Sequence, residues 1–316
     1  MENRLIECLE IALKYQVTDI HLSLYDDNHI SIEMRIDGKI HKLRPKNEDE
    51  HFFRYLMFRA NLDVSSVTEP QTGQFEMILD GKKLSLRFSV VSSFKLTSGV
   101  LRILSNHSIL EINDLTYDKE VIEYLRSITE DTCGLYLFSG PTGSGKTTTL
   151  YTLLDSCVGK KIYTLEDPIE VYSNNYIQIQ INDKQGMSYA EGIKQLMRQD
   201  PDIIMIGEIR DTLAAQMAVR VSLTGHLVVS SIHASSAEIT IQRMLELGVP
   251  EYQLLDVLKG ISNQRLFSTK NHKKIGIYEV MNQKEITYYG EHKKHTEFYK
   301  TIDNKIEESR NLGIIS

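Results

Sequence analysis

The sequence predicts an α/β protein in two parts, a small N-terminal α+β domain with an antiparallel sheet and a larger domain built on a parallel sheet. Three observations lead to this prediction. The chain has 316 residues, which corresponds to about two domains. Apolar and polar residues alternate through two hairpin patterns in the first part of the chain. Beyond residue 118, short apolar runs are separated by helical stretches, as in buried parallel strands joined by crossover helices.

The N-terminal part, residues 1–104, is expected to be the smaller domain. Apolar residues in its first segment recur at helical spacing (Leu5, Ile6, Leu9, Leu13), which indicates an amphipathic helix. The elements expected after it are, in order, a hairpin over residues 30–43 that turns at Asp37-Gly38, a helix over 49–62, a hairpin over 75–90 that turns at Asp80-Gly81, and a strand over 100–104. Consecutive hairpins predict an antiparallel sheet.

Composition divides the rest of the chain. Residues 105–118 are polar, lack a clear period and form the expected linker. The larger domain, residues 119–267, contains short apolar runs that are the expected parallel strands, at residues 135–139, 161–165, 203–206 and 227–232. Residues 268–316 are polar and charged. We expect them to form a C-terminal extension, and the sequence assigns no role to its last part, residues 285–316.

Composition also excludes several functional classes. Lys and Arg number 36 against 43 Asp and Glu, so the net charge is −7 and there is no overall positive field for gripping nucleic acid. Cys8, Cys133 and Cys157 are too scattered for a disulfide framework or a zinc site and fit a reducing cytosol. No apolar run approaches the ~18 residues of a membrane span, and the first residues do not form a secretory signal. Any membrane role should therefore be peripheral.

The most specific motif is a glycine-rich loop at residues 140–147, GPTGSGKT, which matches GxxxxGK[ST] and lies between a strand-like run and a helix-forming segment. Its glycines let backbone N–H groups surround a phosphate, and the positive end of the following helix faces the same anion. Lys146 should reach the β- and γ-phosphates of ATP, and Thr147 should coordinate Mg²⁺. The expected nucleotide-binding residues are Gly140, Pro141, Thr142, Gly143, Ser144, Gly145, Lys146, Thr147 and Thr148.

Two apolar strands end in acids. The run at 202–208 ends in Glu208, the candidate to orient or activate water, because Gly207 stands where a metal-associated aspartate is usual. The run at 162–166 ends in Glu166 at the edge where α/β sheets bind ligands, and Pro168 stops the strand there. The alternative for both acids is an ordinary solvated strand end.

Two histidines flank the apolar run at 227–232. His226 follows a glycine at the start of this strand, and we expect it to contact the γ-phosphate or the attacking water. His233 stands at the opposite end and is equally consistent with a structural role. No cysteine lies at ligand spacing from either histidine, so a zinc site is not expected.

Four blocks occur in order, GPTGSGKTTTLY, TLEDPIE, LMRQDPDIIMIGEIRD and TGHLVVSSIHA, and together they resemble the secretion ATPases of type II secretion and type IV pilus systems. The front of the chain, with VTDIHLSLYDD and SIEMRIDGKI, is similar to that family's N-terminal domain. The likeness covers about residues 1–267 and continues weakly to GIYEVM at 276–281. It implies a RecA-like P-loop core that hydrolyses ATP with Mg²⁺, preceded by a smaller PAS-like α+β domain.

The resemblance also implies a homo-hexameric ring. In that family, arginines of the N-terminal domain reach the nucleotide, and Arg87 and Arg102 match them, while Arg198 matches an arginine on the phosphate side. Loss of the γ-phosphate on hydrolysis would release these arginines and let the two domains rotate about the linker. The catalytic set that the resemblance implies is Glu208, Glu166, His226, Arg87, Arg102 and Arg198.

Within the family, the compact chain is most similar to the competence pseudopilus ATPases of Gram-positive bacteria. We expect neither the extra N-terminal module nor the four-cysteine zinc insertion of type II secretion assembly ATPases, and these residues do not contain the AIRNLIRE-like motif of retraction motors. The resemblance implies a cytoplasmic motor, peripheral to the inner face of the cell membrane, that drives an inner-membrane platform protein and the pseudopilin machinery. DNA would be cargo of the system and not a direct ligand.

Three alternatives to this reading stay open. The first is a pilus retraction or general secretion ATPase, which uses the same chemistry. The second is a nucleotide-binding ring scaffold with little turnover, against which the intact Glu208 argues. The third is a DNA-pumping motor, against which the negative net charge argues.

Overall fold

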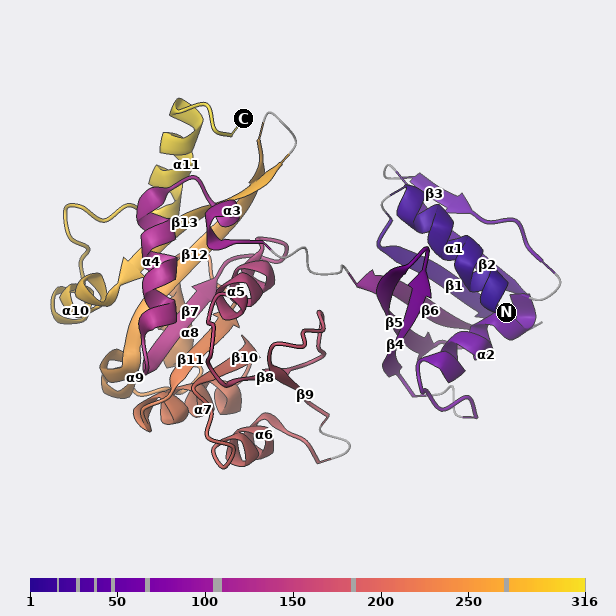
Figure 1. Cartoon of the computed structure of the whole chain (residues 1–316), viewed down its shortest axis with the longest axis horizontal. Helices are drawn as coiled ribbons and strands as arrows, with labels where there is room; N and C mark the ends of the chain where they lie inside the picture. The colour runs from indigo at the N-terminus through magenta and orange to yellow at the C-terminus, as the bar shows by residue number, and fades with distance from the viewer. Residues whose placement is uncertain are drawn as a thin grey trace. The chain divides into compact units, whose positions relative to one another are not determined.

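The computed structural model describes residues 1–15, 17–26, 29–36, 39–46, 49–65, 69–104, 110–182, 186–269 and 273–315. The chain divides into two compact units, Met1–Ser108 and Ile109–Ser316, which are drawn in Figure 1. Each unit has a hydrophobic core of its own.

The first unit is an α+β domain with an antiparallel sheet, as the sequence predicts. Within the described ranges its sheet has the order β3-β2-β1-β6-β5-β4, and neighbouring strands run antiparallel. The helices α1 (Glu2–Lys14) and α2 (Asp49–Arg59) bury Leu5 and Phe53 in the core that they share with the sheet. The strands are β1 (Asp19–Tyr25), β2 (Ile30–Ile36), β3 (Lys39–Lys42), β4 (Gln71–Leu79), β5 (Lys82–Ser92) and β6 (Leu96–Leu104).

One of the two predicted hairpin turns of this unit lies within the described residues. Asp80-Gly81 forms the turn between β4 and β5, and both residues have positive φ, 50° and 75°. The Asp37-Gly38 turn lies outside the described residues.

A buried ion pair ties α1 to the start of α2. The Arg4 guanidinium donates to both carboxylate oxygens of Asp49, at 2.8 and 2.9 Å. Both residues are buried, with 5% and 4% of their surface exposed. The bidentate geometry satisfies two charges that would be costly to bury alone.

The second unit is built on a sheet whose described strands have the order β13-β12-β7-β11-β10-β8-β9. All neighbours are parallel except β12 and β13, which form an antiparallel pair at one edge. The central strands are buried on both faces, which explains their continuous apolar runs. The strands are β7 (Gly134–Ser139), β8 (Ile162–Glu166), β9 (Ile177–Gln180), β10 (Ile203–Ile209), β11 (Leu227–Ile232), β12 (Leu258–Ser268) and β13 (Lys274–Asn282).

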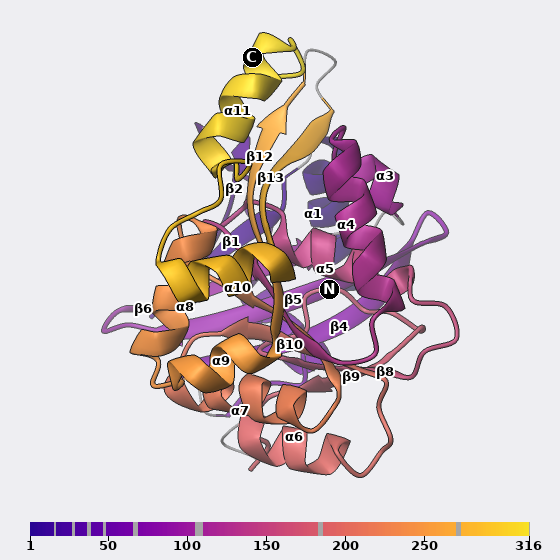
Figure 2. The ribbon, with the colours of Figure 1, turned by 90° about the vertical axis from the view of Figure 1, so that its left-hand side faces the viewer.

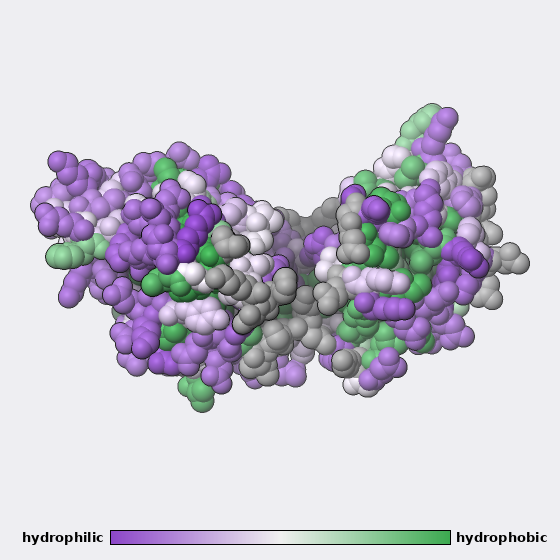
Figure 3. Space-filling model, turned by 90° about the horizontal axis from the view of Figure 1, so that it is seen from above, coloured by the Kyte–Doolittle hydropathy of each residue, from purple (hydrophilic) through white to green (hydrophobic). Residues whose placement is uncertain are grey.

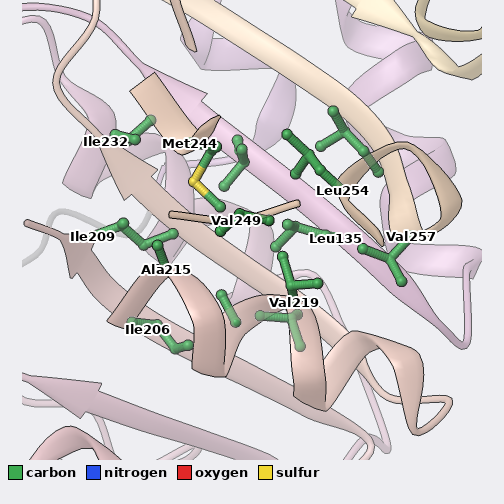
Figure 4. Packing of buried hydrophobic residues seen from close by; sticks show 14 of the residues in the cluster. Leu135, Ile206, Ile209, Ala215, Val219, Ile232, Met244, Val249, Leu254 and Val257 are labelled. Carbon is green, nitrogen blue, oxygen red and sulfur yellow. The ribbon is translucent and has the colours of Figure 1, made fainter. Parts of the chain in front are cut away.

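Helices cover both faces of this sheet. One face packs against α3 (Ile112–Leu115), α4 (Lys119–Glu130) and α5 (Lys146–Asp155). The opposite face packs against α6 (Tyr189–Leu196), α7 (Thr212–Leu223), α8 (Ala237–Glu246), α9 (Glu251–Val257) and α10 (Gln283–His292). Figure 4 shows Ala215 and Val219 of α7 facing the sheet residues Leu135, Ile206 and Ile232. This α/β core confirms the predicted fold class.

The C-terminal residues belong to the same layers. β13 pairs with β12 across the boundary that the sequence analysis draws at residue 268, and α11 (Ile302–Asn311) packs along β13 (Figure 2). Of the predicted linker, residues 105–109 lie outside the described ranges, and α3 falls in its second half.

Hydrophilic residues predominate on the face of the chain that Figure 3 shows, with smaller hydrophobic groups between them. No helix in the described part of the chain has the length and apolar character needed to span a bilayer.

Candidate nucleotide-binding site

The strands that carry the sequence-predicted residues end at one edge of the second unit's sheet. β7, β8, β10 and β11 are parallel, so their carboxyl ends meet there. A cavity of about 540 Å³ opens at this edge, lined by the glycine-rich loop, Glu166, Glu208, Arg210 and His233. This volume lies within the roughly 300–1,000 Å³ range of small-molecule sites.

The glycine-rich loop joins β7 to α5 and turns through three glycines with positive φ, Gly140 (147°), Gly143 (76°) and Gly145 (90°). A β-carbon on Gly140 would stand 2.6 Å from the carbonyl oxygen of Gln264, so only glycine fits there. Gly145 is the N-cap residue of α5. The first N–H groups of this helix border the cavity and have no carbonyl partner within the helix, which is the arrangement that binds anions.

Lys146 is the first residue of α5, and its side chain is folded over the loop. Its ammonium donates to the carbonyl oxygens of Gly140, at 2.8 Å, and Pro141, at 3.1 Å. Burial lowers the pKa of Lys146, and the negative charge of Glu208 opposes that shift. A partly desolvated ammonium attracts phosphate oxygens more strongly than one in water. The cavity therefore places a cation where the motif predicts one.

Glu208 is held on two sides at the end of β10. One carboxylate oxygen lies 3.1 Å from Nε2 of His233, and the other accepts a hydrogen bond of 2.8 Å from the Arg210 guanidinium. The Glu208 side chain is 21% exposed, so water can reach it while its position stays fixed. This arrangement suits a group that orients water or accepts a proton from it.

The structure corrects the expectation for His226. This residue precedes β11, and its carbonyl oxygen accepts from the N–H of Gly134 at the start of β7. It therefore lies at the amino ends of the strands, across the full length of the sheet from the phosphate loop. His233, which follows the carboxyl end of β11, contacts Glu208 instead. The choice of His226 was wrong because the predicted parallel sheet already places the carboxyl end of each strand at the site, and His233 follows that end of β11.

Arg198 also lies away from the cavity. It follows α6 in the connection that leads back to the amino end of β10, where Lys161 Nζ donates to the neighbouring Gln199 carbonyl. It is not among the residues that line the cavity. Its predicted role on the phosphate side stays a prediction.

Glu166 is deeply buried at the end of β8, with 4% of its surface exposed. It accepts hydrogen bonds from Thr164 (2.6 Å), Gln178 (3.1 Å) and the Tyr151 hydroxyl. Burial raises the pKa of Glu166 above its ordinary range, although these donors favour the charged form. Its carboxylate lines the cavity in a fixed orientation.

The geometry around Gly207 leaves little room for a larger side chain. A β-carbon at this position would lie 3.2 Å from the Leu165 carbonyl oxygen and 3.3 Å from Cγ of Glu166. A larger side chain at position 207 would therefore require Leu165 and Glu166 to shift by a few tenths of an ångström.

Arg87 and Arg102 lie in the first unit and are directly opposite each other on β5 and β6. They alternate with buried residues such as Leu86 and Leu101 and so project from the face of the sheet that is turned away from the core. The guanidinium of Arg102 donates to Asp19 at 2.6 Å. Their predicted role at the nucleotide stays a prediction.

The donor set at the cavity fits a nucleotide-bound magnesium ion. Thr147 supplies a hydroxyl in the first turn of α5, and Glu166 and Glu208 supply carboxylates. Among the described residues, no cluster of three or more His, Cys, Asp and Glu could hold a metal ion alone. Mg²⁺ commonly binds through one or two protein groups together with substrate phosphates, and this site offers that arrangement.

Sequence reasoning missed two residues of the site. Arg210 is two positions beyond Glu208, which brings both side chains to the same side of an extended chain, and this spacing was the available signal. Gln178 reaches Glu166 only because β9 pairs with β8, with Gln178 opposite Thr164. No local pattern reports such a pairing.

Comparison with known proteins places the whole arrangement in a family. The family model described as Type II/IV secretion system protein matches residues 1–305. The chain belongs to this family. It is 30% identical to the competence protein ComGA of Bacillus subtilis, over 98% of this chain and 93% of that protein. It is 38% identical to a putative type II secretion system protein E of Escherichia coli over 82% of this chain, and it spans about half (53%) of that protein's length.

Solved structures agree on the fold. A crystal structure of the pilus retraction motor PilT with bound ADP matches with a TM-score of 0.74 and 25% identity, over 98% of this chain and 94% of that one. The ATPase DotB of Legionella pneumophila matches with a TM-score of 0.71 and 19% identity, over 98% and 91% of the two chains. The resemblance deduced from the four sequence blocks is thereby confirmed.

Proposed function

We propose that this chain is a Mg²⁺-dependent ATPase and the motor of a secretion-type machine. The observation that carries the proposal is the cavity itself, where the phosphate-binding loop, Glu208 and His233 lie together at one sheet edge. Membership of the family and likeness to a motor with bound ADP support it.

In the proposed reaction, a water oxygen attacks the γ-phosphorus of ATP, the bond to the β–γ bridging oxygen breaks, and a proton of the water passes to Glu208. His233 and Arg210 suit this step because they hold the Glu208 carboxylate at the cavity wall. Lys146 and the loop N–H groups bind the phosphate oxygens and stabilise the charge that develops on them. Mg²⁺, held by Thr147 and the phosphates, would supply further neutralisation of that charge.

We further propose that the chain works as a homo-hexamer in which Arg87 and Arg102 reach a nucleotide from the first unit, and Arg198 reaches a nucleotide bound to a neighbouring copy. A guanidinium offers permanently charged, planar donors for phosphate oxygens, and such arginines contribute about 10³–10⁵ in rate. Loss of the γ-phosphate would release them and allow the two units to move.

The cellular setting that fits best is assembly of a competence-type pseudopilus for uptake of transforming DNA. Likeness to the competence protein ComGA over nearly the whole of both chains supports this choice. The partners would be an inner-membrane platform protein and the pseudopilins, with the motor at the cytoplasmic face of the membrane. A retraction motor is the second candidate, because the PilT structure matches over 98% of this chain.

The motor proposal is tested by ATP turnover per chain across a series of protein concentrations. We expect turnover to rise steeply with concentration as copies assemble, and Arg87→Ala to abolish the rise. Arg35→Ala, an arginine on β2 of the same sheet, is the matched control and should keep it. Turnover that is independent of concentration and unaffected by Arg87→Ala would remove the shared-site hexamer.

The setting is tested in the source organism by replacing the gene with a Glu208→Gln copy. Loss of transformation by external DNA, with surface pili still retracting, supports the competence assignment. Intact transformation with lost retraction would favour the retraction motor.

A further inference from the structure

The two faces of the β12–β13 hairpin contact two different parts of the candidate site. One face contacts the phosphate-binding loop and α5, and the other contacts the segment that follows β11. Residues directly opposite each other on the two strands share a face, and the register pairs Gln264 with Tyr278 and Asn263 with Glu279. All four side chains are almost fully buried, with 2% or less of their surface exposed. Buried polar groups of this kind are costly unless each finds a partner, so their partners define what they hold.

On the first face, the pair Gln264 and Tyr278 holds the phosphate-binding loop and its helix. The Gln264 side-chain amide donates to the carbonyl oxygen of Ser144 at 2.7 Å, inside the glycine-rich loop. The Tyr278 hydroxyl lies 2.8 Å from the hydroxyl of Thr149 in α5. The loop carries the N–H groups that face phosphate, so Gln264 fixes the conformation in which those groups converge.

On the opposite face, Asn263 and Glu279 hold the segment that follows β11. The Asn263 amide donates both to the Ser139 hydroxyl, at 2.8 Å, and to the Ala234 carbonyl oxygen, at 3.1 Å. Glu279 accepts from the Ala237 N–H, at 3.3 Å, at the start of α8. Ser139 immediately precedes the phosphate-binding loop, and Ala234 immediately follows His233. One amide therefore sets the spacing between the loop and the histidine that contacts Glu208.

We infer that Gln264 and Asn263 are positioning residues for nucleotide hydrolysis, with Gln264 fixing the phosphate-binding loop and Asn263 fixing the His233 segment against it. This inference rests on the proposed ATPase function. Neither residue lines the cavity, so both act through the groups that they hold. Because the two residues hold different parts of the site, their loss should affect different steps. Loss of Gln264 should weaken nucleotide binding, and loss of Asn263 should slow hydrolysis.

The test compares Gln264→Ala and Asn263→Ala in the full chain, with a fluorescent ATP analogue for affinity and phosphate release for turnover. Gln264→Ala should raise the Kd about tenfold and leave kcat within about threefold, because one buried hydrogen bond contributes about a factor of ten. Asn263→Ala should lower kcat about tenfold and leave the Kd within about threefold. Gln264→Met and Asn263→Leu have similar side-chain volumes, remove the same donors and add no buried charge, so they replace the alanine variants if those do not fold.

Thr152→Val is the matched control, because Thr152 of α5 is fully buried, does not line the cavity, and its hydroxyl makes no hydrogen bond in the described structure. It should leave both parameters within twofold. Equal changes of Kd and kcat in both test variants, or values like those of the control, would overturn the inference.

Hydrogen exchange of the backbone amides separates this inference from the proposed function. Gln264→Ala should speed exchange in residues 140–147, and Asn263→Ala should speed exchange in residues 233–237, whether or not the chain hydrolyses ATP. Unchanged exchange in both segments would overturn the positioning role. If the wild-type chain binds no ATP but the two variants still show these exchange effects, only the proposed function is refuted.

Discussion

Gly207 is the position at which the structure makes its sharpest prediction. Restoring the usual aspartate with Gly207→Asp should damage the site, although it completes the ordinary motif. A β-carbon there would lie 3.2 Å from the Leu165 carbonyl oxygen and 3.4 Å from Cα of Glu166, so backbone atoms would have to move. Glu166 cannot turn away freely, since Thr164, Gln178 and Tyr151 all donate to it.

The expected magnitude follows from two contributions. Overpacking of a well-packed site costs about 1–3 kcal/mol, and this is the whole effect expected for Gly207→Ala. Gly207→Asp also places a second carboxylate next to Glu166. Two like charges about 4 Å apart repel by about 4 kcal/mol at an effective dielectric constant of 20, and this is an upper bound because burial already raises the pKa of Glu166 and its protonation relieves the repulsion. The largest sum, about 5–7 kcal/mol, is comparable to the whole stability of an ordinary domain.

The assay is urea unfolding followed by circular dichroism, because the chain contains no tryptophan for a fluorescence readout. Gly207→Ala should shift the transition of the second unit to lower urea, and Gly207→Asp should shift it further and abolish ATP turnover. Gly207→Ala is the control for Gly207→Asp, because it adds the β-carbon without the charge. A Gly207→Asp chain with wild-type stability and turnover would refute the claim that this position leaves little room for a larger side chain.

Three further predictions follow from individual contacts. His233→Ala should lower ATP turnover at least tenfold because Glu208 loses a partner, whereas His226→Ala should stay within twofold; the reverse order in a phosphate-release assay would contradict the site described here. Because burial raises the pKa of Glu166 in the folded state, the protonated group contributes stability below about pH 4.5, and this contribution is lost as the pH rises to the pKa of the folded state. Glu166→Gln should therefore flatten the fall of the unfolding free energy with pH, measured by urea titrations at several pH values. An unchanged pH dependence in this variant would contradict a buried acid at position 166. Asp49→Ala should destabilise the first unit by about 1–3 kcal/mol in thermal unfolding, because Arg4 loses two buried hydrogen bonds and keeps its contacts with Glu7 and the Arg44 carbonyl oxygen; an unchanged melting temperature would contradict this.

Much of the fold follows from local pattern. The alternation of the first part of the chain predicts antiparallel hairpins, and short apolar runs predict buried parallel strands, because each pattern reports how many faces of a strand are covered. The glycine-rich loop predicts its own surroundings, since a strand, a turn with positive φ and a helix are all needed to bind phosphate. Glu166 and Glu208 were also predicted to lie at the ligand-binding edge, and the structure brings them to one cavity.

The remaining features depend on contacts between distant segments. The predicted parallel sheet puts His233 at the ligand-binding edge, but its contact with Glu208 appears only when β11 pairs beside β10. Asn263 and Gln264 sit in a β12 segment with no catalytic motif, and their role appears only when β12 pairs with β7 beside the loop. Composition likewise predicts a C-terminal extension after residue 267, whereas β13 in that segment completes the edge of the sheet.

The central claim is that Glu208 drives hydrolysis in a cavity that binds ATP through the loop at residues 140–147. The most direct test measures phosphate release and fluorescent-ATP binding for the wild type and for Glu208→Gln, which keeps the shape of the side chain and removes its charge. The account predicts a fall in turnover of at least about 10²-fold with nucleotide affinity within about threefold of wild type. Wild-type turnover in Glu208→Gln would contradict it.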